Sequence, residues 1–129
     1  MEKYFFVFGA FLAGLAVAAG AFGAHGLEDI VTPDRIAIWE KAVRYQMYHA
    51  LTLIMISWAT THWWSRSNTL RAASWFFVLG IILFSGSLYY LVANGELAYN
   101  GISLGILTPI GGVFFVFGWF ALMIAAWRA

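Results

Sequence analysis

The chain alternates four long apolar segments with short polar ones. The apolar segments cover residues 4–24, 45–64, 72–93 and 102–127, and charged or turn-forming residues bracket each of them. A bilayer core about 30 Å thick is crossed by about 20 helical residues, so each segment is long enough to span it. The runs are continuous and do not alternate with period two, which indicates helices. The pattern predicts an all-α integral membrane protein, with residues 1–129 forming one compact bundle of four transmembrane helices.

The segment before the second apolar run predicts a further, amphipathic helix. Thr32 suits an N-cap and Pro33 the first helical position. Apolar side chains that include Trp39 share one face, and charged side chains lie on the opposite face. No helix breaker follows before Trp64, and a straight helix of that length exceeds the thickness of the membrane core. We therefore expect residues 33–44 to lie on the outer surface, or at an angle to it, and to bend into the second span. A straight, protruding helix is the alternative.

Composition agrees with a membrane setting. Apolar residues make up 63% of the chain and charged residues 10%, with a mean hydropathy of +0.81. Soluble domains average about 45–50% apolar and about 25% charged residues, and a small domain cannot bury so large an apolar excess. The net charge of +1 argues against a nucleic-acid partner. The absence of cysteine excludes disulfides, thiolate metal sites and a cysteine nucleophile.

The distribution of charge predicts an orientation. Four spans place both termini and the 65–71 loop on one side of the membrane. That loop contains Arg66 and Arg71 and no acid, whereas the opposite side carries most of the acidic residues. Because basic residues favour the cytoplasmic side, we expect both termini in the cytoplasm.

Small residues recur at helical spacing along three of the segments. Membrane helices associate closely where such residues line up, so these faces are expected to pack against other helices. The residues concerned are Ala10, Gly14, Ala18 and Ala21 in the first segment, Gly80 in the third, and Gly111 and Gly112 in the fourth. Pro109 lies in the first third of the fourth segment, where its missing N–H predicts a kink.

Polar residues are expected to gather at the outer ends of the first three helices. His25 continues the small stripe of the first segment, and Gln46 and His49 stand three residues apart on one face of the second. Helices joined by a short loop are usually neighbours, so His25 and His49 are expected at similar depth. The candidate cluster comprises His25, Gln46, His49, Ser85, Ser87 and Tyr89.

Three interpretations of this cluster are open. It can be a hydrogen-bonded network that holds the helix ends together, since buried polar groups are normally paired. It can bind a haem, quinone or lipid between helices, around His25 and His49. It can be catalytic, with a histidine as base and Ser85 or Ser87 as nucleophile. No acid follows at triad spacing and two histidines leave zinc short of ligands, so the pattern predicts neither a metal nor any other cofactor and favours a protein that is not an enzyme.

Several stretches together resemble a known family. They are residues 20–27 (GAFGAHGL), 39–51 (WEKAVRYQMYHAL), 84–89 (FSGSLY) and 109–112 (PIGG), followed by Gly118 and Trp119. Over nearly the whole chain they resemble the small bacterial membrane proteins grouped as domain of unknown function 423. The resemblance implies a four-span protein of the bacterial inner membrane and implies no activity. We expect a structural or interaction protein in the lipid bilayer, whose small-residue faces bind a second copy or another membrane protein.

Overall fold

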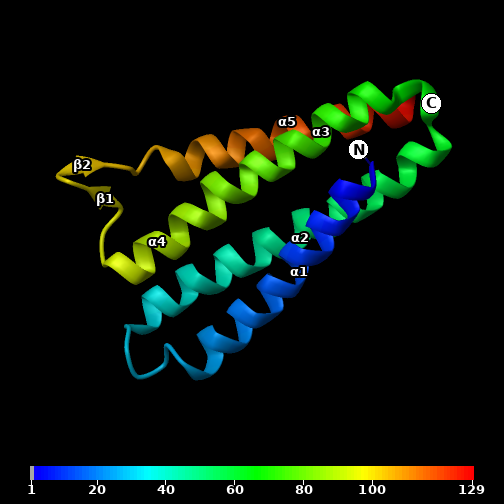
Figure 1. Cartoon of the computed structure of the whole chain (residues 1–129). Helices are drawn as coiled ribbons and strands as arrows, with labels where there is room; N and C mark the ends of the chain where they lie inside the picture. The colour runs from blue at the N-terminus through cyan, green and yellow to red at the C-terminus, as the bar shows by residue number, and fades with distance from the viewer. Residues whose placement is uncertain (1) are drawn as a thin grey trace.

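A computed structural model describes residues 2–129 and is mostly helical (Figure 1). The elements in chain order are α1 (Glu2–His25), α2 (Pro33–His62), the 3-10 turn η1 (Trp64–Arg66), α3 (Ser67–Gly80), the π-helical turn η2 (Ile81–Ser85), α4 (Gly86–Asn94), the strands β1 (Ala98–Tyr99) and β2 (Ile102–Ser103), and α5 (Leu107–Trp127). Both termini and the turn between α2 and α3 lie at one end of the molecule. The α1–α2 loop and the strand pair lie at the other (Figure 1).

Three helical segments are long and apolar enough to cross a membrane. They are α1, the continuous rod Trp64–Asn94 and α5. The long helix α2 is more polar, because Gln46, His49 and several hydroxyl residues interrupt its apolar sequence. These polar side chains are buried against other helices. By length and composition, three of the four predicted segments are therefore able to cross a membrane, and α2 differs because it carries polar side chains that are buried against other helices.

The central position of α2 explains its polarity. It packs along α1 on one side and against α3, η2 and α4 on the other, while α5 packs on α3 and η2 (Figure 1). The core between these helices is built from Leu53 and Ile56 of α2, Phe77 of α3 and Phe115 of α5. A helix enclosed in this way can carry polar groups, because other helices and not lipid supply their partners.

Residues 33–44 do not form a separate surface helix, so that prediction is wrong. They continue into residues 45–62 as the single helix α2. The indole of Trp39 donates a 2.8 Å hydrogen bond to the carbonyl of Ala19 in α1. Arg35 donates to the carbonyl of Leu91 at 2.8 Å and to that of Gly95. The apolar face assigned to the membrane surface thus packs between α1 and α4.

The fourth helix begins later than the apolar pattern indicates. Residues 98–103 form an antiparallel hairpin instead, with Ala98 paired to Ser103 and Tyr99 to Ile102. Asn100 and Gly101 have φ values of +49° and +78°, the left-handed conformations that a two-residue turn of type I′ requires. Because α5 starts at Leu107, Pro109 falls in its first turn, where no intrahelical donor is missed. The missing N–H of Pro109, on which the predicted kink rests, therefore breaks no hydrogen bond within α5.

The π-helical turn η2 interrupts the continuous rod Trp64–Asn94, called the third rod below, and rotates the side chains that follow it about the helix axis. Such a turn contains more residues than an α-turn, so the residues on either side of it face different directions. Here the amide of Gly86 donates to the carbonyl of Ile81. Ser85, at the end of the turn, is fully buried and donates a 2.7 Å hydrogen bond to the carbonyl of Ala42 in α2. The π turn thus presents the following polar residues of α4 to α2.

Candidate functional site

Gln46 and Tyr89 form the centre of a polar link across three helices. The Tyr89 hydroxyl of α4 donates to Oε1 of Gln46 in α2 at 2.8 Å. The Gln46 amide nitrogen donates in turn to the carbonyl of Leu12 in α1, also at 2.8 Å. Gln46 is buried, so each of these bonds forms where water does not compete. These two hydrogen bonds hold α2 in one position along α1 and α4.

The two candidate serines are held by other partners. Ser85 bonds to the carbonyl of Ala42, while the Ser87 hydroxyl lies 2.9 Å from the carbonyl of Phe84 and 2.6 Å from the hydroxyl of Thr108. Within residues 2–129, no hydrogen bond joins either serine to a histidine. A nucleophile is activated by a base within hydrogen-bonding reach, so this arrangement does not supply the catalytic pair considered from the sequence.

His49 is buried and both of its ring nitrogens are engaged. Nδ1 lies 2.7 Å from the carbonyl of Tyr45, which can only accept, so Nδ1 carries the proton. Nε2 accepts a 3.2 Å hydrogen bond from the indole of Trp119 in α5. The ring also stacks on Phe115, with centroids 3.6 Å apart and an interplanar angle of 4°. His49 is thus a neutral side chain that joins α2 to α5, with no ring nitrogen free to ligate iron.

His25 lies far from His49, contrary to the depth predicted for the pair. It is exposed and ends α1. Because α1 and α2 are antiparallel, residues near the loop face each other, whereas Gln46 and His49 lie beside the region of Gly9 and Leu12. At 1.5 Å per residue, His25 is about 20 Å further along the bundle. The two histidines therefore do not enclose a common ligand site.

The glycines of α3 and α5 lie at close helix contacts. A Cβ added to Gly111 would lie 2.8 Å from the Cβ of Phe84 and 2.9 Å from the carbonyl carbon of Leu83. A Cβ at Gly80 would overlap the ring of Phe115. Gly112, next to Gly111, has its nearest such neighbour at 3.9 Å and is only partly enclosed. These contacts let the third rod and α5 approach closely.

The small stripe of the first segment faces outward instead. Its members are exposed on α1, and a Cβ at Gly14 would have no atom within 4 Å. A second set of small residues, Gly9, Ala16 and Gly23, is buried against α2. The exposed stripe consists of Ala10, Gly14, Ala18 and Ala21. Within the bundle, the close packing expected of the stripe is therefore made by Gly9, Ala16 and Gly23, and the stripe itself is left for contacts outside the bundle.

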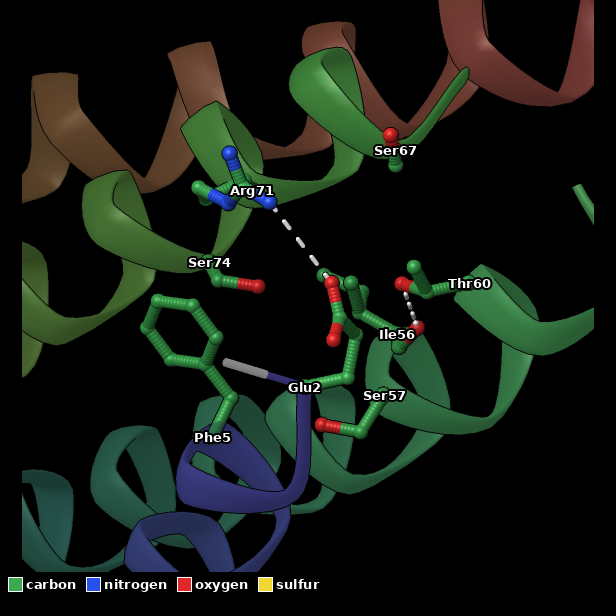
Figure 2. Close-up of a pocket in the computed structure, with 8 residues that line it drawn as sticks. All are labelled: Glu2, Phe5, Ile56, Ser57, Thr60, Ser67, Arg71 and Ser74. Atoms are coloured by element: carbon green, nitrogen blue, oxygen red, sulfur yellow. Dashed lines mark hydrogen bonds and ion pairs between the residues drawn. The ribbon is translucent and has the colours of Figure 1, made fainter. Parts of the chain in front are cut away.

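A polar cavity that sequence reasoning missed lies at the end of the molecule near the N-terminus (Figure 2). It has a volume of about 10 Å³, about the space one water molecule needs. Arg71 of α3 extends toward Glu2 of α1, with Nη2 and Oε1 3.7 Å apart. Nε of Arg71 is buried without a hydrogen-bond partner. Hydroxyl groups complete the polar lining, from Ser57, Thr60, Ser67 and Ser74.

The sequence gives a weak signal for this cavity. Glu2 and Arg71 lie outside the apolar segments of the sequence, and the hydroxyl residues recur on helical faces without a motif. Three of the hydroxyls donate to carbonyls of their own helices, at 3.0 Å for Ser57, 2.8 Å for Thr60 and 3.1 Å for Ser74. Across residues 2–129, no group of three or more histidine, cysteine or acidic side chains is placed to hold a metal ion.

Comparison with known proteins identifies the family. The family model described as "Protein of unknown function (DUF423)" matches residues 19–112. The chain belongs to the DUF423 family. The resemblance noted from the sequence is therefore confirmed, and no solved structure matches the chain.

Relatives of this DUF423 protein match it over nearly its whole length. A UPF0382 membrane protein of Staphylococcus epidermidis is 46% identical over 123 residues, covering 95% of this chain and 94% of its own. The UPF0382 membrane protein YwdK of Bacillus subtilis is 42% identical over 125 residues, covering 96% of each chain. These names and the apolar helices establish a bacterial membrane protein of the DUF423 family.

Proposed function

We propose that this protein spans the membrane four times and assembles with a second copy of itself through the outer face of α1. The observation that supports this best is the exposure of Ala10, Gly14 and Ala18, which follow one another at intervals of four residues. Small residues at this spacing let two membrane helices approach closely. Because the opposite face of α1 is already packed on α2, the exposed stripe remains available to a partner.

A second copy suits this stripe better than an unrelated partner. In a two-fold dimer the same surface of each subunit meets itself, so a row of small residues is complementary to its own copy. Leu15 and Val17 flank the row and are exposed, so each can pack beside the partner helix. No charged residue interrupts α1 between Lys3 and its end. Dispersion contacts and weak Cα–H···O bonds would hold such a pair together.

The fourth span in this proposal is α2. Its polar side chains, including Gln46 and His49, are buried among the other helices, while Leu51, Met55 and Trp58 are exposed where lipid would surround them. The end that holds both termini also carries Arg66 and Arg71. By the positive-inside rule this end faces the cytoplasm, with the protein in the bacterial inner membrane.

The self-association is tested by enlarging the exposed glycine. Gly14→Leu should convert a dimer to a monomer, because the side chain stands between the two helices. Gly86→Leu is the matched control, since Gly86 is also an exposed helical glycine and the nearest neighbour of its added Cβ lies 4.0 Å away. Energy transfer between donor- and acceptor-labelled copies in liposomes, measured over a range of protein-to-lipid ratios, reports the dimer.

Two results would refute the proposal. One is a wild-type protein that stays monomeric at every protein-to-lipid ratio. The other is a Gly14→Leu protein that dimerises as well as the Gly86→Leu protein. Thermal unfolding of each variant serves as the folding control, because neither glycine is packed within the monomer.

A further inference from the structure

An apolar groove opens sideways between α1 and α3. Its volume is about 660 Å³, within the range of sites that hold a small molecule or one chain of a lipid. Tyr4, Phe8 and Phe11 line it from α1, and Trp75 and Val78 from α3. They belong to the first half of α1 and the first half of the rod Trp64–Asn94, and both of these halves begin at the end of the molecule that holds the termini (Figure 1).

The groove exists because α1 packs on α2 and meets α3 near its own N-terminal end. There Phe5 packs edge-on against Trp75, with ring centroids 5.5 Å apart, and Glu2 faces Arg71. Further along α1, the side chains of Phe8 and Phe11 line the groove without closing it. The α1 residues from Tyr4 to Phe11 extend about 12 Å at 1.5 Å per residue, a little less than one leaflet of a core about 30 Å thick.

Two basic residues adjoin the residues that line the groove, at the end of the groove nearest the N-terminus of α1. Arg71 is one helical turn before Trp75, and Lys3 directly precedes Tyr4, whose ring centroid is 5.3 Å from Nζ of Lys3. Glu2 is the acid at this position and faces Arg71. Within residues 2–129, two cations therefore stand beside one carboxylate next to the apolar groove.

The guanidinium of Arg71 has N–H donors that make no hydrogen bond within residues 2–129. Of its five N–H groups, one on Nη1 bonds to Asn68 at 3.3 Å, and Nη2 faces Glu2 at 3.7 Å, beyond hydrogen-bonding distance. Its side chain is 36% exposed, so the outer part of the guanidinium can be reached from outside the protein. Phosphate oxygens are strong acceptors for such a group.

We propose that this groove binds an anionic phospholipid of the leaflet on the side of the termini. One acyl chain lies along Phe8, Phe11 and Val78, and the phosphate lies against Arg71 and Lys3. Tyr4 and Trp75 sit beside the glycerol region, where aromatic side chains are favoured. The inference does not depend on dimerisation through α1, because the stripe from Gly14 to Ala21 lies beyond the groove along the helix, further from the N-terminus.

The test compares two lipids with identical acyl chains, phosphatidylglycerol and phosphatidylcholine. The full-length protein is equilibrated with an equal mixture of both, and native mass spectrometry counts the lipid that each molecule retains. The net charge at the groove mouth should enrich the bound phosphatidylglycerol about fivefold. The double variant Lys3→Gln, Arg71→Gln should lose this preference. The control Arg66→Gln, Arg128→Gln removes the same charge from the same end and should keep it, because these two residues lie against each other at the ends of η1 and α5 and neither is next to a groove-lining residue along its helix.

The groove itself is tested by narrowing it. Val7 lines the groove and is exposed, so Val7→Trp should reduce retention of both lipids by at least half. The control Val113→Trp changes an exposed valine of α5 outside the groove and should retain lipid as the wild type does. Equal retention of the two lipids by the wild type, or an unchanged preference in the Lys3 and Arg71 variant, would overturn the proposal. A groove filled by a second protein copy would also overturn it, and would appear as a lipid-free oligomer that Val7→Trp dissociates.

Discussion

Gly111 and Gly112 are adjacent in α5 but differ sharply in the space around them. A methyl group on Gly111 would overlap the backbone nitrogen of Phe84 and lie 2.8 Å from its Cβ, whereas one on Gly112 would meet only the ring of Phe84, at 3.9 Å. Both residues follow the first turn of the same helix. Substituting each by alanine therefore changes helix propensity equally and packing very unequally.

The expected magnitudes follow from these distances. Replacing a helical glycine by alanine stabilises a helix by about 1 kcal/mol. Overpacking costs about 1–3 kcal/mol, and the upper part of this range applies at Gly111 because the obstacle includes backbone atoms of η2 that cannot rotate away. Gly111→Ala should lower the free energy of unfolding by about 2 kcal/mol. Gly112→Ala should raise it by up to about 1 kcal/mol.

The assay is reversible unfolding in mixed micelles, with the fraction of sodium dodecyl sulfate as the denaturing variable. Tryptophan fluorescence and circular dichroism follow the transition, and wild-type protein measured in parallel sets the reference. The difference between the two variants should be about 3 kcal/mol. Equal stabilities for Gly111→Ala and Gly112→Ala would refute the close approach of α5 to η2.

Two further predictions concern the polar link and the orientation. Tyr89→Phe removes the donor to the buried Oε1 of Gln46, and should lower the free energy of unfolding by about 1–3 kcal/mol in the same assay. The control Tyr48→Phe, at an exposed tyrosine, should leave the free energy of unfolding unchanged. Equal losses in the two variants would contradict the stabilising role of the link between Tyr89 and Gln46. The chain has no cysteine, so Asn68→Cys and Glu96→Cys can be labelled singly with a membrane-impermeant maleimide added outside cells. Position 96 should react and position 68 should not, and the reverse pattern would invert the proposed topology.

Apolar run length was sufficient to predict α1, the third rod and α5, because the thickness of hydrocarbon sets the length of a membrane helix. It was not sufficient at residues 102–106, which are apolar but belong to a hairpin and turn. The signal there was present as Asn100 followed by Gly101, a pair typical of a two-residue hairpin turn. The π turn Ile81–Ser85 has no comparable signal in the sequence.

The candidate site was predictable in part. Gln46 and Tyr89 do meet, since they lie on facing sides of neighbouring helices. The prediction for His25 failed because His25 ends α1 beside the loop, whereas His49 lies in the middle of α2, well away from that loop. The inward face of α1 could not be chosen from composition, because Gly9 and Gly23 offer a small-residue face as suitable as that of Gly14.

The polarity of α2 bears on how the chain enters the bilayer during synthesis. Alone in hydrocarbon, α2 would expose the amide of Gln46 and the imidazole of His49, an unfavourable state that opposes its independent partitioning. The partner of Gln46 is made early, since the carbonyl of Leu12 in α1 can accept its hydrogen bond as soon as both helices have been synthesised. The partner of His49 is made last, because the indole that donates to its Nε2 belongs to Trp119, 70 residues downstream. In the four-span arrangement proposed above, the polar side chains of α2 therefore have all their partners only when the final helix has been made.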